Sequence, residues 1–234
     1  METRPDSPSP AAFRLIVLGC LAFMALTFTA MALFPGGTMR DHGTHHYHFF
    51  DNFFSDLGGT VTPSGQRNRL CMILFFFAML TAGASVAAFF HKFADLFRSS
   101  PVTRRIARIA AILGFISGAG FIGVGVIPWN LNLHAHISAV NTAFNVLTVA
   151  VVLVTISLWL DKSAPRACVW IFLSYFVLLV SYLVLLGYGH HLHSQTGRAI
   201  QVAGQKVIVY ASIAAIGCQA WIADRQLRLA QETR

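Results

Sequence analysis

Six long runs of apolar residues, separated by polar segments, dominate the pattern along this chain. They cover residues 13–34, 70–91, 106–127, 134–160, 167–187 and 199–222. A helix needs about 20 mostly apolar residues to span a bilayer, and each run is at least that long. Only helices and closed barrels satisfy the backbone within lipid, and these runs are too continuously apolar for barrel strands. The pattern therefore predicts an all-α, polytopic membrane bundle of six transmembrane helices.

The polar segments complete the predicted organisation. Residues 1–12 are polar and proline-containing and predict a disordered tail, residues 13–222 the transmembrane domain, and residues 223–234 a second tail. The first connection, 35–69, is much longer than the others. Inside it, phenylalanines recur at helical spacing opposite aspartate and serine, and a pair of glycines follows. This pattern predicts a short amphipathic helix over 48–57 that lies in the membrane interface.

Composition and charge support a membrane protein with a defined orientation. The chain is 56% hydrophobic and 11% charged, whereas soluble domains carry about 25% charged residues. On one side of the predicted bundle lie Arg4, Arg14, Lys92, Arg98, Arg104, Arg105, Arg108, Lys162, Arg166, Arg225, Arg228 and Arg234. On the other side lie Arg40, Arg67, Arg69, Arg198 and Lys206. The positive-inside rule then predicts cytoplasmic termini, and it explains the net charge of +8 without a nucleic-acid partner.

Histidines concentrate on the predicted outer side, in the segments 42–48, 134–136 and 190–193. Histidine titrates near neutral pH and is a common metal ligand. Imidazole and carboxylate ligands suit zinc, with copper as an alternative. The candidate metal ligands are His134, His190, His191 and His193, completed by Asp56. For the segment 42–48, simple solvation explains the histidines as well as a site does.

The fourth apolar run carries a polar face. His134, Ser138 and Asn141 follow one another at spacings of four and three, and Asn145 and Thr148 continue the series. Such spacing places all five on one side of a helix. Because polar groups are costly in lipid, this face is predicted to point into the bundle. Hydrogen bonding between helices is the alternative role for its two deeper members.

Lys206 lies about two turns inside the last apolar run. A lysine at that depth needs a partner or a route to the interface. Asp56 is the predicted partner, and snorkelling is the alternative. Ser55, Asp56, His134 and Lys206 are therefore expected to converge in one outer pocket. The further pocket candidates, which bind rather than react, are Ser138, Asn141 and Gln205.

Three short motifs occur in a characteristic order. FSDLG at 54–58 precedes Asn68, GFIGVGVIP at 120–128 precedes His134, and GQK at 204–206 opens the last run. Over residues 13–220 this order resembles the prokaryotic six-helix membrane family known as domain of unknown function 998, which is distantly similar to the eukaryotic Frag/DRAM/Sfk group. The family typically has arginine where this chain has Lys206. The resemblance implies six helices in a prokaryotic plasma membrane, and the link of the eukaryotic group to lipid remodelling favours a lipid ligand.

The sequence is compatible with several functions. The main hypothesis is a polar, histidine-containing pocket at the extracytoplasmic face that binds a lipid head group or a metal ion. A metal-dependent lipid hydrolase with Ser55 and Asp56 as catalytic residues is the first alternative. An external metal or pH sensor, haem held by His134 and His191, and a purely structural bundle are the others. Phosphate-loop and G-x-S-x-G motifs are absent from the sequence, and the glycines at 118, 120 and 123 lie inside an apolar run, not between a strand and a helix as in a dinucleotide fingerprint, so none of these enzyme classes is indicated.

Overall fold

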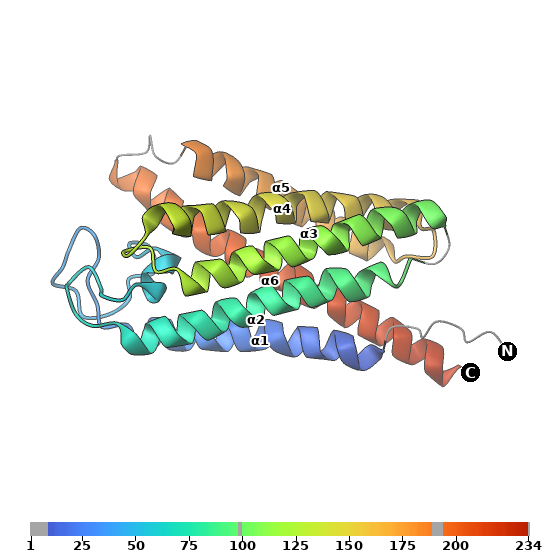
Figure 1. Cartoon of the computed structure of the whole chain (residues 1–234), viewed down its shortest axis with the longest axis horizontal. Helices are drawn as coiled ribbons and strands as arrows, with labels where there is room; N and C mark the ends of the chain where they lie inside the picture. The colour runs from blue at the N-terminus through green and yellow to red at the C-terminus, as the bar shows by residue number, and fades with distance from the viewer. Residues whose placement is uncertain (1–8, 98–99, 189–193, 234) are drawn as a thin grey trace.

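The computed structural model describes residues 9–97, 100–188 and 194–233, and these fold into a bundle of helices. Six of them are long and apolar enough to cross a membrane, which confirms the predicted architecture (Figure 1). They are α1 (Pro10–Ala32), α2 (Arg69–Ala94), α3 (Pro101–Val126), α4 (Leu133–Leu160), α5 (Arg166–Tyr188) and α6 (Gln195–Glu232).

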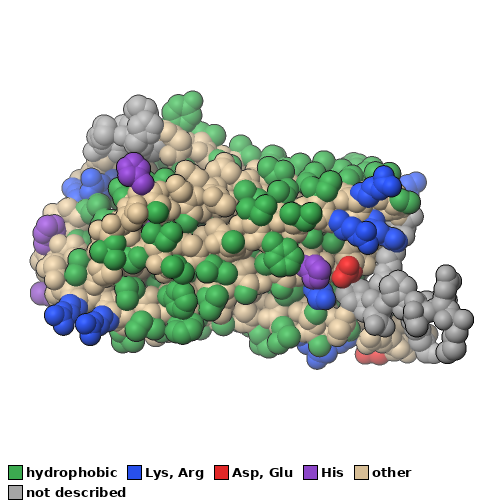
Figure 2. Space-filling view, viewed as in Figure 1, with side chains coloured by type: hydrophobic (Ala, Val, Ile, Leu, Met, Phe, Trp, Pro, Cys, Tyr) green, Lys and Arg blue, Asp and Glu red, His purple; other side chains and the backbone are tan. Residues whose placement is uncertain are grey.

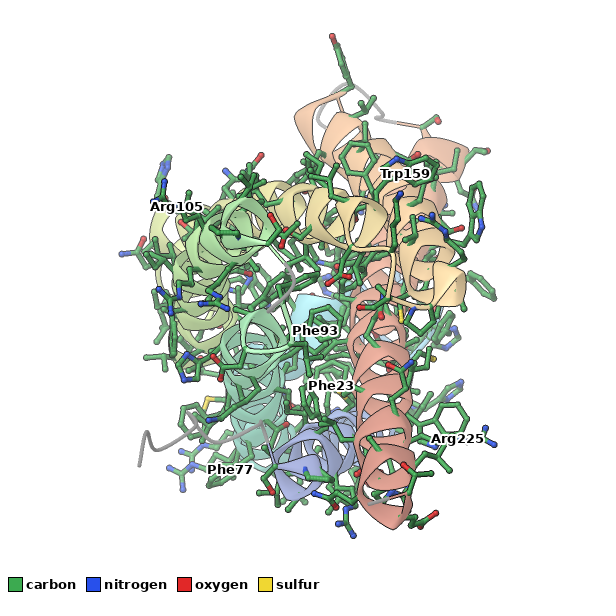
Figure 3. The ribbon with its side chains drawn as sticks, turned by 90° about the vertical axis from the view of Figure 1, so that its right-hand side faces the viewer. Phe23, Phe77, Phe93, Arg105, Trp159 and Arg225 are labelled. Atoms are coloured by element: carbon green, nitrogen blue, oxygen red, sulfur yellow. The ribbon has the colours of Figure 1, made fainter. Side chains whose placement is uncertain are left out.

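Consecutive helices run antiparallel and pack as neighbours, and α6 returns to pack against α1. Seen along the bundle, Phe23 and Phe93 point inwards, whereas Arg105, Trp159 and Arg225 point outwards (Figure 3). The start of α1 and the end of α6 lie at one end of the bundle, here called the terminus end. The connection between α1 and α2 covers the other end, here called the loop end. Figure 2 shows that the charged side chains gather at these two ends and that apolar side chains cover much of the surface between them.

Local sequence explains where the helices begin and how closely they pack. Ser9, Ser100 and Asn132 each cap a helix by accepting a hydrogen bond from a backbone N–H of its first turn. Between helices, a Cβ on Gly118 would lie 2.5 Å from the carbonyl oxygen of Gly83. The absence of side chains there lets α2 and α3 approach through their backbones.

Helix α6 extends further than the sequence pattern predicted. It continues to Glu232, through most of the segment expected to be a tail. The extension remains packed because Ala223 and Asp224 are buried, and Asp224 forms ion pairs with Arg14 of α1 and with Arg228 one turn along. Two buried positions and two charge pairs therefore hold a polar segment in the helix.

The amphipathic helix predicted over 48–57 is wrong in extent. A turn occupies 49–52, and only Phe54–Gly58 is helical, as the short 3-10 helix η1. The side-chain oxygen of Asn52 accepts a hydrogen bond from the backbone N–H of His48 at 2.9 Å, and such local bonds compete with helix formation. Side chains from both expected faces are buried, Phe54 and Leu57 as well as Asn52 and Asp56, whereas Phe50 is 64% exposed.

Candidate functional site

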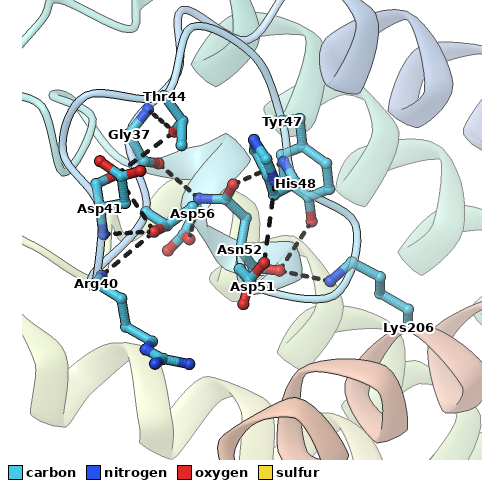
Figure 4. Close-up of polar contacts among 11 residues, drawn as sticks. Gly37, Arg40, Asp41, Thr44, Tyr47, His48, Asp51, Asn52, Asp56 and Lys206 are labelled. Carbon is cyan, nitrogen blue, oxygen red and sulfur yellow. Dashed lines mark hydrogen bonds and ion pairs between the residues drawn. The ribbon is translucent and has the colours of Figure 1, made fainter. Parts of the chain in front are cut away.

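Asn52 organises the connection that covers the loop end. Its side-chain amide donates hydrogen bonds to the carbonyl oxygen of Gly37 at 2.9 Å and to Oδ2 of Asp56 at 3.0 Å. Gly37 has a φ of 87°, a conformation that favours glycine. Asn52 is fully buried, and Figure 4 shows it at the centre of the polar contacts. The long connection is thereby folded into a compact cover.

Asp56 is the buried carboxyl of this cover. Its Oδ2 accepts hydrogen bonds from the side chain of Asn52 and from the backbone N–H of Phe53, the latter at 2.9 Å. Burial raises the pKa of the Asp56 carboxyl from 3.8 to about 6, although the two hydrogen bonds and the charge of Lys206 act in the opposite direction. The carboxyl therefore becomes charged at a higher pH than a solvated aspartate does.

Lys206 reaches the same network from α6, but it does not bond Asp56 directly. Its ammonium donates a hydrogen bond to the carbonyl oxygen of Asn52 and lies over the rings of Tyr47 and Phe49, 5.3 and 5.0 Å from their centroids. The lysine is 1% exposed, so snorkelling to the surface does not describe it. The expected pairing with Asp56 takes an indirect form, with Asn52 between the two charges (Figure 4).

Two further side chains fix the cover to the helices. The backbone N–H of Phe54 donates to Oε1 of Gln205 on α6 at 2.7 Å. The amide of Asn68, just before α2, donates to the carbonyl oxygens of Gly59 and Leu57 at 2.9 and 3.1 Å. Both ends of η1 are thus held by amide side chains, and the position of Ser55 and Asp56 follows from this anchoring.

Beside the cover lies a cavity of about 390 Å³ between η1, α4, α5 and α6. Its residues are Met39, Phe53, Ser55, Asp56, Trp129, Leu133, His136, Ile137, Val140, Tyr182, Leu186, Gln201 and Gln205. Apolar side chains from α4 and α5 make its walls. Ser55 and Asp56 from η1, His136 from α4 and two glutamines from α6 bring polar atoms to it. The volume is within the range of small-molecule sites.

His136 and Trp129 present defined hydrogen-bonding groups at this cavity. Nδ1 of His136 lies 2.7 Å from the carbonyl oxygen of Ile127. Since a carbonyl only accepts, Nδ1 carries the proton in the neutral ring, and Nε2 is then an acceptor. The indole N–H of Trp129 is buried and has no hydrogen-bond partner within the described residues. The cavity thus offers the Nε2 acceptor of His136 to a ligand, whereas the indole N–H of Trp129 is packed against Gly59.

The structure brings together only part of the predicted site. Ser55, Asp56 and Gln205 line the cavity. Lys206 belongs instead to the adjoining network, and His134 does not join them because it is exposed on α4. The remaining predicted metal ligands, His190, His191 and His193, lie outside the described residues.

The prediction that the polar face of α4 points into the bundle is wrong. His134, Ser138, Asn141 and Asn145 are all exposed, and Thr148 is only half-buried. The buried face of α4 instead carries His136, followed by small and apolar residues. Successive helical positions are 100° apart, so the face that includes His134 directs His136 to the opposite side of the helix.

The metal hypothesis gains no support from the described residues. Nowhere in the described ranges do three or more His, Cys, Asp or Glu side chains come close enough to hold a metal ion. His134 and Asp56, the two described members of the predicted ligand set, are separated because one faces outwards and the other is buried in the cover.

Sequence reasoning missed His136, Trp129 and Gln201 as cavity residues. For His136 a signal was present, because Val140, Ala143 and Leu147 follow it at positions four, seven and eleven, the spacing of a buried helix face. For Trp129, its place directly after Pro128 suggested only an anchor at the membrane boundary. Its position at the cavity depends on the fold of the long connection.

Comparison of the chain with family models, with curated proteins and with solved structures finds no match. The resemblance to the family known as domain of unknown function 998 therefore depends on the three motifs alone. The candidate site has to be interpreted from its own geometry.

Proposed function

We propose that the protein binds an amphipathic lipid at the loop end of the bundle. In this proposal the head group lies among Asp56, His136 and the glutamines of α6, and the acyl chain follows the apolar walls made by α4 and α5. The observation that carries the proposal is the composition of the cavity, in which apolar side chains of membrane-spanning helices adjoin a small set of polar atoms. Sites of this composition are typical of ligands with one polar and one apolar part.

The charges around the cavity favour an uncharged head group. None of the described residues that line it is a lysine or an arginine, whereas Asp56 contributes a carboxyl. A phosphate group would meet no cation and one negative charge there, which is unfavourable. Ser55 and Gln205 can donate hydrogen bonds and Asp56 and His136 can accept them, so these lining residues suit a head group with hydroxyl or amide groups. Diacylglycerol and ceramide have this chemistry.

Binding is favoured over lipid hydrolysis by the partners of the candidate catalytic groups. His136 donates from Nδ1 to a backbone carbonyl, and Asp56 accepts from Asn52 and Phe53. The acid and the imidazole therefore do not form the relay that activates a serine in hydrolases. A serine-directed fluorophosphonate tests the alternative. Labelling of Ser55 that is lost in His136→Ala would favour the hydrolase.

The proposal places the cavity on the extracytoplasmic side of a prokaryotic plasma membrane, on the basis of the basic residues at the terminus end. Cysteine labelling tests this orientation in a Cys218→Ser background, which removes the exposed native thiol. An impermeant maleimide added to intact cells is expected to label His45→Cys at the loop end but not Lys162→Cys at the terminus end. The reverse labelling pattern would place the cavity on the cytoplasmic side.

Native mass spectrometry of protein purified in a mild detergent tests the function. Val140 is buried and lines the cavity, so Val140→Phe fills part of it, whereas Val177→Phe adds the same volume on the exposed surface of α5. We expect the wild type and Val177→Phe to retain a neutral lipid and Val140→Phe to lose it. Equal lipid retention by a folded Val140→Phe variant would contradict the proposal.

A further inference from the structure

The exposed face of α4 is unusually polar for a membrane-spanning helix. His134, Ser138, Asn141 and Asn145 form a stripe along it, and we call these four residues the α4 stripe. The opposite face of the helix is buried against the rest of the bundle and includes Ala143. The α4 stripe therefore points directly away from the bundle interior.

The stripe reaches well into the membrane. Asn145 is twelve residues after Leu133, the first residue of α4, which corresponds to about 18 Å along the helix axis. The complete helix of 28 residues extends about 42 Å and therefore exceeds the hydrocarbon thickness of about 30 Å. An exposed amide at this position would be close to the bilayer centre, where polar groups facing lipid are unfavourable.

The hydrogen bonds within the chain satisfy the α4 stripe only in part. The side-chain amide of Asn145 donates to the carbonyl oxygen of Asn141 at 2.8 Å, and this is its only hydrogen bond within the described residues. Its second N–H and its carbonyl oxygen are left facing outwards. In a bilayer these groups gain a partner only from another membrane-embedded molecule.

We propose that the α4 stripe is the interface between two copies of this chain, related by a twofold axis along the membrane normal. Such an axis places each residue opposite its own copy at the same depth. Side chains that meet themselves must be self-complementary. Asparagine fulfils this condition because its amide both donates and accepts.

Two features of the sequence agree with a second copy as the occupant. The whole of α4, residues 133–160, contains no lysine, arginine, aspartate or glutamate, so the symmetric contact brings no fixed like charges together. Beyond the stripe, the same exposed face continues with Val149 and Ile156. These apolar side chains extend the contact toward the terminus end without a polar group that needs a partner.

Crosslinking of variants with one introduced cysteine tests this inference in liposomes, again in a Cys218→Ser background, where the three remaining native cysteines are buried. Ser138→Cys places a thiol in the α4 stripe, and Ser181→Cys places one on the exposed face of α5 at a similar distance from the loop end. With a short bis-maleimide at high lipid dilution, we expect covalent dimers from Ser138→Cys and none from Ser181→Cys. Equal crosslinking of both variants, or none with Ser138→Cys, would overturn the proposal.

A second measurement separates a specific contact from mere proximity. Adding Asn145→Leu to the Ser138→Cys variant removes the deepest amide, and we expect it to weaken dimerisation about tenfold. Ser181→Leu, which removes an exposed polar side chain from α5, is the matched control and is expected to have no effect. Unchanged crosslinking with Asn145→Leu would contradict the inference, as would crosslinking in native membranes to a different protein instead of a second copy.

Discussion

The two ends of the bundle hold their buried carboxyl groups in different ways. At the terminus end, Asp224 forms direct ion pairs with Arg14 at 3.3 Å and with Arg228 at 2.8 Å, and both arginines are about half exposed. At the loop end, Asp56 and Lys206 are both buried and are joined through Asn52. Water thus reaches the cations of the first arrangement, whereas the cation of the second is buried.

This difference indicates at which end a substitution should lower the folding stability more. Surface charge pairs are screened by water and contribute little to stability. Buried charged groups lose their solvation, so each depends on the partners that the fold provides. The loop end also adjoins a cavity in which polar side chains lie beside apolar walls. Polar side chains that are held rigidly beside a cavity suit a binding site.

Removing Lys206 should have the largest effect. Lys206→Leu leaves the carbonyl oxygen of Asn52 without its ammonium donor and leaves Asp56 without a nearby cation. We expect a loss of about 3 kcal/mol in the free energy of unfolding. Thermal unfolding in detergent measures it. Arg198→Leu removes a charge from the first turns of the same helix and should cost little, and an equal loss in both variants would contradict the account.

The second-largest effect should be the change in folding stability with pH that Asp56 causes. Its pKa is raised by folding, so its contribution to stability is complete below about pH 4 and is lost as the pH rises through about 6. Relative to Asp56→Asn, the wild type should therefore lose about 2 kcal/mol between pH 4 and pH 7. Unfolding of both proteins across this range checks the sign. A relative gain of wild-type stability with rising pH would show that Asp56 is stabilised in its charged form.

A smaller effect is expected at the terminus end. Arg228→Ala removes one of the two cations beside Asp224, and its half-exposed position limits the loss to about 0.5 kcal/mol. Because such pairs are screened, the difference from the wild type should shrink at high salt. Unfolding at low and high ionic strength measures this. A cost as large as that of Lys206→Leu would remove the contrast between the two ends.

The histidines of the long connection should matter least for stability. His45 and His46 are exposed, so replacing both with alanine should change the free energy of unfolding by less than about 0.5 kcal/mol. The same variant separates the remaining sensor hypothesis from the cavity. Loss of neutral lipid on removing these histidines would mean that the connection, and not the cavity, controls binding.

The sequence predicted the helices well because their signal is local. Runs of about 20 apolar residues define the spans whatever their neighbours are. The extension of α6 was missed because Asp224 and Arg228 indicate a solvated tail, and their pairing depends on Arg14 from the other end of the chain. That contact becomes visible only when α1 and α6 are packed together.

The site was predicted less completely because its geometry is not local. Asp56 and Lys206 were expected together, and the network contains both, but the role of Asn52, which connects them, was not predicted. The polar face of α4 was expected inside on the argument that polar groups avoid lipid. Polar groups can also face outwards when they meet a partner outside the chain, and such a contact is inferred for Asn145.

Fluorescence of Trp129 tests the central claim most directly, because its indole lines the cavity. The variant used keeps Trp129 and replaces Trp159, Trp170 and Trp221 with phenylalanine, and it is reconstituted into bilayers. Brominated diacylglycerol at low mole fraction should quench this emission, brominated phosphatidylglycerol should quench it far less, and Val140→Phe should abolish the difference. Equal quenching by the two lipids, or a difference that persists in Val140→Phe, would contradict a cavity for uncharged lipid head groups.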